Sequence, residues 1–238
     1  MPVLTRPVVF ITGAAGNLGT AVARAFLKSD ARLVLLDRSA GRLDQLYPEL
    51  TGSADHILAH SVDLTNPAQV EGAVKQTLEK FGQVDVLVNT VGGYRAGSSL
   101  EETRVEDWDF LFDINARSLF ITCRAVLPAM RRVGVGRIIN VSSRAALKGE
   151  AFASLYSASK SAALRLTESI AAEVATTEIR VNCVLPGVID TPVNRQAMPG
   201  ADHHGWVTPE SIAGVILFLA SEAARDIHGA AIPVYGRG

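Results

Sequence analysis

Residues 8–19 read VVFITGAAGNLG, and this stretch decides the fold. It begins as an apolar strand, turns through Gly13, Gly16 and Gly19, and continues into a helical pattern. Glycines let the backbone turn tightly and approach a ligand closely. The first N–H groups of the helix and its dipole favour a pyrophosphate at that point. The spacing is G-x-x-G-x-x-G rather than the common G-x-G-x-x-G, so a plain strand–helix turn is the alternative.

Apolar runs typical of strands recur along the chain, and longer helical patterns separate most of them. Strands are predicted at Val8–Ile11, Arg32–Leu36, His56–Ser61, Val84–Val88, Arg137–Val141, Arg180–Leu185 and Ala231–Val234, and helices at about 18–28, 66–81, 103–132, 155–175 and 208–222. Apolar strands separated by helices indicate a parallel sheet covered on both faces. Right-handed crossovers then predict an α/β fold with a three-layer, doubly wound sheet, whose ligand site lies at the carboxyl ends of the strands.

The composition favours one compact domain over residues 1–238, with 48% hydrophobic and 20% charged residues, and excludes a disordered chain. A formal net charge of −1 leaves no electrostatic footprint for nucleic acid or an anionic membrane. Cys123 and Cys183 give neither a disulfide framework nor a zinc spacing, so no metal is predicted. The nearly apolar run at 212–220 is too short to span a bilayer, and a strand predicted from Val8 leaves no room for a signal peptide. A cytoplasmic protein is expected.

The second strand ends at Asp37. A carboxylate there can accept hydrogen bonds from both adenosine ribose hydroxyls and would repel a 2′-phosphate, which predicts NAD(H) in preference to NADP(H). Arg38 leaves NADP(H) possible, because a guanidinium beside the ribose could tolerate the phosphate; a solvated loop arginine is the alternative. Asp63 closes the third strand and could bond the adenine amino group while Leu64 packs on the ring, although an N-cap or turn aspartate is equally consistent.

The fourth strand ends in NTVGG, residues 89–93, where small side chains would admit the cofactor ribose close to the backbone. The predicted dinucleotide contacts from these first four strand ends are Gly13, Gly16, Asn17, Leu18, Asp37, Arg38, Asp63, Leu64, Asn89, Thr90, Val91 and Gly92.

The residue types for proton transfer follow the fifth strand. Tyr156 and Lys160 are spaced i, i+4 and therefore share a helix face. An ammonium nearby would lower the pKa of the phenol, which is otherwise near 10, and Lys160 could also bond the nicotinamide ribose. Ser143, at the carboxyl end of its strand, can polarise a substrate oxygen, whereas alternation turns Ser142 away. Asn115 could hold a water that passes protons to Lys160, or it could be a satisfied core asparagine.

The ordered motifs TGAAGNLG, Asp63-Leu64, NTVGG, Asn115, VSS, YSASK and PGVIDT resemble the compact subfamily of the short-chain dehydrogenase/reductase family. The resemblance implies a Rossmann-type sheet of seven strands and a homo-oligomer, either a dimer or a tetramer. It also implies a catalytic set of Asn115, Ser143, Tyr156 and Lys160, with Val188 and Thr191 at the nicotinamide end. Two motifs depart from the family: Asn17 stands where a second glycine is usual, and NTVG replaces NNAG.

Residues 192–207 interrupt the regular alternation and are expected to form, within 188–208, a substrate loop or lid. The loop is similar to that of dihydropteridine reductases, which use NADH but generally lack the catalytic serine. Candidate pocket residues are Tyr94, Arg95, Arg144, Asn194, Arg195 and Trp206. Arg144 and Arg195 could pair with an anionic substrate group. The adjacent His203 and His204 are interpreted as a solvated pair, because adjacent residues rarely converge on one metal ion.

These patterns predict an oxidoreductase that transfers a hydride between nicotinamide and a small carbonyl or alcohol substrate, with Tyr156 as the acid/base. The alternatives within enzymes are a 3-oxoacyl-carrier-protein reductase and a dihydropteridine-type reductase. A dinucleotide-binding protein without turnover is the non-enzyme alternative, since fold does not imply function.

Overall fold

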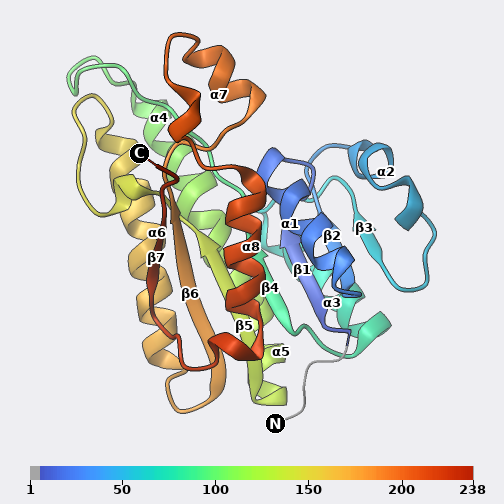
Figure 1. The fold of residues 1–238 in the computed structure, drawn as a ribbon. Helices are drawn as coiled ribbons and strands as arrows, with labels where there is room; N and C mark the ends of the chain where they lie inside the picture. Colours follow the sequence, from blue (N-terminus) through green and yellow to red (C-terminus); the bar gives the residue numbers. More distant parts are fainter. Residues whose placement is uncertain (1–5, 238) are drawn as a thin grey trace.

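The computed structural model describes residues 6–237 and contains one sheet of seven parallel strands in the order β3-β2-β1-β4-β5-β6-β7 (Figure 1). The strands are β1 Val8–Thr12, β2 Arg32–Leu36, β3 Ile57–Ala59, β4 Val86–Asn89, β5 Val135–Val141, β6 Glu178–Pro186 and β7 Ala231–Val234. The order reverses between β1 and β4, which pair with each other in parallel. The carboxyl ends of those two strands therefore form the crevice in which doubly wound sheets bind ligands.

Helices cover both faces of the sheet. They are α1 Asn17–Lys28, α2 Arg42–Leu46, α3 Pro67–Phe81, α4 Val105–Phe112, α5 Ser118–Val133, α6 Ser154–Glu173, α7 Pro192–Ala197 and α8 Pro209–Ala220. Helices α1 and α8 pack together on one face, and α3, α5 and α6 contribute to the core of the other. No helix within residues 6–237 has the length and apolar character needed to cross a membrane.

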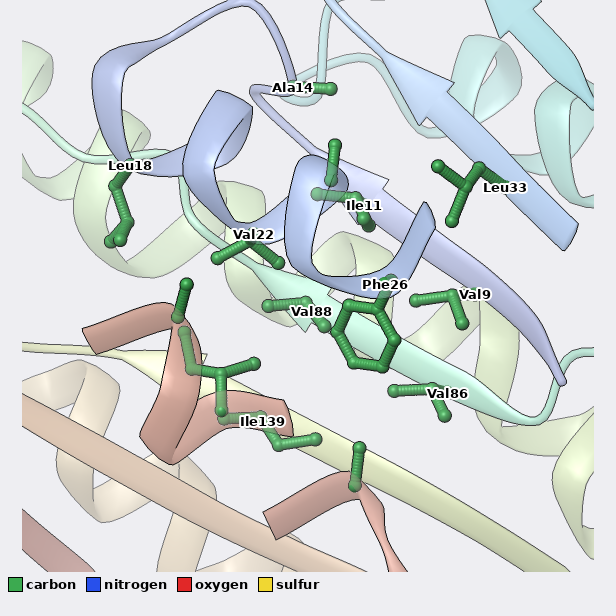
Figure 2. Close-up of a cluster of buried hydrophobic side chains, with 14 of the residues drawn as sticks. Val9, Ile11, Ala14, Leu18, Val22, Phe26, Leu33, Val86, Val88 and Ile139 are labelled. Carbon is green, nitrogen blue, oxygen red and sulfur yellow. The ribbon is translucent and has the colours of Figure 1, made fainter. Parts of the chain in front are cut away.

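Alternation along β1 builds both cores. Val9 and Ile11 belong to the cluster under α1, whereas Val8 and Phe10 belong to the cluster on the opposite face. Figure 2 shows the first cluster, in which Phe26 of α1 lies among apolar side chains from the strands. Because β1 is fully buried, it holds the glycine turn that follows it in a fixed position.

The prediction of a doubly wound α/β sheet is confirmed, and every predicted strand corresponds to an observed one within a few residues. The predicted helix at 103–132 is interrupted, because the five residues Asp113–Arg117 form a π-helix between α4 and α5. A π-segment inserts locally into a helix and often marks a functional position. Hydrophobic periodicity over the whole region does not resolve so short an interruption.

No predicted helix covers α2 or α7. Helix α7 lies inside the stretch that was interpreted as irregular, and its start carries a recognisable signal. The Thr191 hydroxyl accepts a hydrogen bond from the Asn194 N–H at 3.2 Å, and Pro192 occupies the first helical position. A capping threonine followed by proline is typical of a helix start and could have located this helix.

Candidate functional site

The glycine turn after β1 forms a cradle that side chains would fill. Gly13 has a φ of +63°, and a Cβ there would lie 2.7 Å from the Val91 side chain. A Cβ on Gly19 would collide with the Gly13 backbone. Helix α1 begins with no side-chain cap from Gly16 and no acidic residue in its first turn. The turn therefore presents backbone N–H groups and a positive helix end, which fit a pyrophosphate.

Three hydrogen bonds attach the glycine turn to neighbouring segments. The Ala14 N–H donates to the Leu36 carbonyl at 3.0 Å, and the Ala15 N–H donates to Asp37 Oδ2 at 3.3 Å. The buried phenol of Tyr47 donates to the Ala14 carbonyl at 2.7 Å. No sequence pattern predicts this role for Tyr47, because nothing local in the segment that follows α2 places it under the turn.

A cavity of about 610 Å³ extends from the glycine turn past the end of β2 to the start of α7. Of the predicted contacts, those that line it are Gly13, Gly16, Asn17, Leu18, Asp37, Arg38, Asp63, Leu64, Thr90, Val91, Gly92 and Thr191. Arg42, Phe110 and Ile114 line it as well, although no sequence pattern assigned them. The volume lies within the ordinary range for small-molecule and cofactor sites.

Charged residues gather at the end of the cavity beside β2. Asp37 Oδ1 accepts a hydrogen bond from the Ser39 N–H at 2.8 Å, so this carboxylate is fixed by backbone donors on both oxygens. Arg38 and Arg42 line the same region, and neither forms an ion pair with another described residue. Asp63 accepts from the backbone and hydroxyl of Thr65, which lowers the pKa of its carboxyl group.

Asn89 lies outside the cavity, in contrast to the sequence expectation. Its Nδ2 donates to Asn140 Oδ1 at 2.9 Å, and its Oδ1 accepts from the Thr122 hydroxyl at 2.7 Å. The side chain is buried and ties β4 to β5 and α5. A buried amide must find such partners, and here they lie within the protein core. Val188 also does not line the cavity.

The residues predicted to transfer protons lie together around Gly92. A Cβ on Gly92 would lie 2.8 Å from Lys160 Nζ and 3.1 Å from Asn115 Oδ1. Tyr156 is one turn earlier on α6, and Ser143 lies two residues after the end of β5. Gly92 lines the cavity, whereas the residues predicted to transfer protons, Asn115, Ser143, Tyr156 and Lys160, are not among those that line it.

The pKa values differ from the sequence expectation. Burial raises the pKa of the Tyr156 phenol, and the hydrogen bond with Ser143 lowers it by less. The pKa of the phenol is thus raised overall, whereas the sequence predicts that Lys160 lowers it. Burial also lowers the pKa of Lys160 to about 8. Desolvation disfavours the charged form of each group, so Tyr156 retains its proton at neutral pH while Lys160 is still mostly charged.

Asn115 lies in the π-helix, and its side-chain amide hydrogen-bonds to the segment after β4 and to α6. Its Oδ1 accepts from the Gly93 N–H at 2.9 Å, and its Nδ2 donates to the Gly93 carbonyl and to Ser159 Oγ, each at 3.0 Å. These bonds join the segment after β4 to α6. Ser142 points away from the cavity and donates to the Lys160 carbonyl at 2.8 Å, as strand alternation predicts.

The loop at 188–208 is anchored at its base by backbone bonds between Val207 and both Val188 and Asp190. Arg195 is engaged by Asp190, with Nε–Oδ1 and Nη2–Oδ2 distances of 2.5 and 2.7 Å. The proposed pairing of Arg195 with a substrate anion is therefore corrected, because a bidentate carboxylate already holds its guanidinium. His203 packs against the Trp206 ring with centroids 4.4 Å apart.

The chain is similar to known proteins over nearly its whole length. Residues 7–202 match the family described as short chain dehydrogenase. The chain is 36% identical to 2-(R)-hydroxypropyl-CoM dehydrogenase of Xanthobacter autotrophicus, over 96% of this chain and 97% of that protein. It is 33% identical to 3-oxoacyl-[acyl-carrier-protein] reductase FabG of Thermotoga maritima, over 96% of each. The solved structure of ElxO with NADP bound superposes with a TM-score of 0.89 at 28% identity, over 98% of each chain.

Proposed function

This chain belongs to the short-chain dehydrogenase family and is an oxidoreductase, and from that premise we propose that it interconverts a small carbonyl compound and its alcohol with Tyr156 as the acid/base. One observation carries the proposal. Gly92 lines the cavity that fits a dinucleotide, and the same glycine lies directly against Lys160 Nζ, one helical turn from Tyr156.

Each residue has a defined task in this scheme. A bound nicotinamide dinucleotide would supply or accept the hydride. Tyr156 holds a proton at neutral pH and donates it to the substrate oxygen during reduction. Ser143 donates a hydrogen bond to that oxygen, and the Lys160 ammonium stabilises the phenolate that remains. We also assign Asn115 the role of holding the water that returns a proton to Lys160, with its side-chain amide fixing the π-helix in place.

Replacement of the phenolic hydroxyl tests the proposal. Tyr156→Phe removes the acid/base, and general acid–base catalysis is typically worth about 10²–10⁴-fold in rate, so kcat should fall within that range. Dinucleotide affinity, measured by calorimetry, should change little because the turn after β1 is untouched. Tyr235, which follows β7 and does not line the cavity, provides the matched control, and Tyr235→Phe should retain activity. A Tyr156→Phe enzyme with full turnover would remove the mechanism.

We propose NAD(H) as the preferred dinucleotide. The Asp37 carboxylate, fixed by backbone donors at the end of β2, supports this choice because it would repel a 2′-phosphate. Arg38 and Arg42 line the same cavity, and their positive charges would instead favour a 2′-phosphate. The similar protein ElxO has a solved structure with NADP bound. Comparison of KM for NADH and NADPH decides between them. Asp37→Ser should shift the ratio toward NADPH, and a clear NADPH preference in the unaltered enzyme would contradict the Asp37 argument.

Two substrate classes remain within the proposal. Similarity to the 3-oxoacyl-[acyl-carrier-protein] reductase supports a 3-oxoacyl thioester, and the compact-subfamily motifs agree with it. The resemblance of the 188–208 loop to dihydropteridine reductases supports a quinonoid pterin. We favour a carbonyl substrate because Ser143 can polarise a carbonyl oxygen. Assays with an acetoacetyl thioester and with quinonoid dihydropterin, each with NADH, distinguish the two, and turnover of the pterin alone would reverse our preference.

We also propose that the chain forms a homo-oligomer. Val105 and Trp108 on α4 and Phe120 on α5 expose large apolar side chains, which a second subunit could cover. Sedimentation equilibrium measures this directly, and a monomer at micromolar concentration would contradict it.

A further inference from the structure

The aromatic side chain of Tyr94 lies beside the proposed proton donor, Tyr156, and is largely exposed. The ring of Tyr94 contacts Tyr156 edge to face, with centroids 4.7 Å apart and planes at 77°. The Tyr94 side chain is nevertheless 69% exposed. Large aromatic residues normally bury their rings, and exposed ones at a concave site commonly contact ligands.

Both residues next to Tyr94 make contacts with other elements. Both backbone polar groups of Gly93 are bonded to the Asn115 amide. On the other side, Arg95 pairs with Asp107 at 2.5 Å and stacks over the Phe110 ring at 3.8 Å. The neighbours of Tyr94 are therefore fixed before any ligand binds, which lowers the entropy lost when a ligand contacts this position.

The position of the ring relative to the cavity indicates what it would contact. Gly92 lines the dinucleotide cavity, whereas Tyr94, two residues later, does not. Tyr94 therefore lies just past the cavity, against the residue that exchanges a proton with the substrate. We infer that Tyr94 determines substrate specificity by offering its ring to a flat aryl group on the reacting carbonyl carbon. This inference rests on the proposed function and narrows its substrate class to aryl ketones and aryl carbinols.

Binding of unreactive carbonyl analogues tests the inference without turnover. Benzamide and cyclohexanecarboxamide have similar size, but only the first is flat. Calorimetry with and without NADH should show tighter binding of benzamide to the unaltered chain. An aromatic pair adds about two- to tenfold in affinity, so Tyr94→Leu should lose a preference of that size. Tyr94→Phe keeps the ring and should retain the preference.

Phe218→Leu is the matched control, because it removes another exposed aromatic ring, on α8, and should leave the preference unchanged. An equal affinity of the unaltered chain for the two amides, or an unchanged preference in Tyr94→Leu, would overturn the inference.

A parallel assay separates this inference from the proposed function. Acetophenone and cyclohexyl methyl ketone form a matching reactive pair. If the chain binds benzamide preferentially through Tyr94 but reduces neither ketone, the assigned carbonyl chemistry fails while the aryl site stands. If it reduces both ketones equally well and Tyr94→Leu changes nothing, the carbonyl chemistry stands and the aryl site fails.

Discussion

A single methyl group at Gly92 should slow catalysis without unfolding the protein. The substitution Gly92→Ala places a Cβ 2.8 Å from Lys160 Nζ and 3.1 Å from Asn115 Oδ1. Ordinary van der Waals contact begins at 3.4 Å, so the ammonium must retreat by about 0.6 Å, the difference between 3.4 and 2.8 Å. The backbone at Gly92 does not adopt a positive φ, so alanine introduces no backbone strain.

This displacement of Lys160 should change the stability of the fold little but lower kcat clearly. Lys160 Nζ is the end of a flexible side chain, so we expect the free energy of unfolding to change by less than about 1 kcal/mol. Misplacement of a catalytic group by about 1 Å can lower a rate by roughly a hundredfold, so a displacement near half that size should lower kcat by about tenfold. The KM for the dinucleotide should change less than kcat, because the added methyl points toward Lys160.

Steady-state kinetics and urea denaturation on the same preparation measure both effects. Gly72→Ala in α3 is the control, because a Cβ there meets no atom within 4 Å and kcat should be unaltered. A Gly92→Ala enzyme with unchanged kcat would refute the argument that close contact with Gly92 positions Lys160. A large loss of stability would refute the argument that the contact can relax.

Two further substitutions have defined outcomes. Burial lowers the pKa of Lys160 from near 10.5 to about 8, so the folded state releases this proton before the unfolded state does and stability should rise between about pH 8 and 10.5. Lys160→Met should abolish catalytic activity and remove this rise in stability with pH. At about 1.4 kcal/mol per pKa unit, it should also add up to about 3 kcal/mol of stability at pH 7. The same dependence of unfolding free energy on pH in both proteins, measured by urea denaturation, would contradict this. Tyr47→Phe removes the hydrogen bond to the Ala14 carbonyl and should raise the KM for the dinucleotide about fivefold with kcat unchanged, the loss expected for about 1 kcal/mol. An unchanged KM would show that the glycine turn keeps its shape without this bond.

The local patterns of the chain determined the fold and most of the cavity lining. Glycines at 13, 16 and 19 predict a tight turn, and a Cβ on Gly13 or Gly19 would indeed collide with neighbouring atoms. Apolar runs between helices predict a buried parallel sheet. Carboxyl ends of parallel strands meet at one edge. Asp37 and Asp63 therefore line one cavity with the glycine turn, although they are separated along the sequence. These inferences need only residue type, period and spacing.

The sequence by itself therefore specified a doubly wound sheet and the residue types of a proton-transfer site. Only the tertiary structure decided that Asn89 is buried in the core, that Asn115 clamps Gly93, and that Tyr94 lies against Tyr156. The physical reason is that these outcomes depend on partners from distant segments, which compete for the same side-chain hydrogen bonds and burial. The raised pKa of the Tyr156 phenol has the same origin, since desolvation is set by everything packed around the ring and not by the spacing to the next charge.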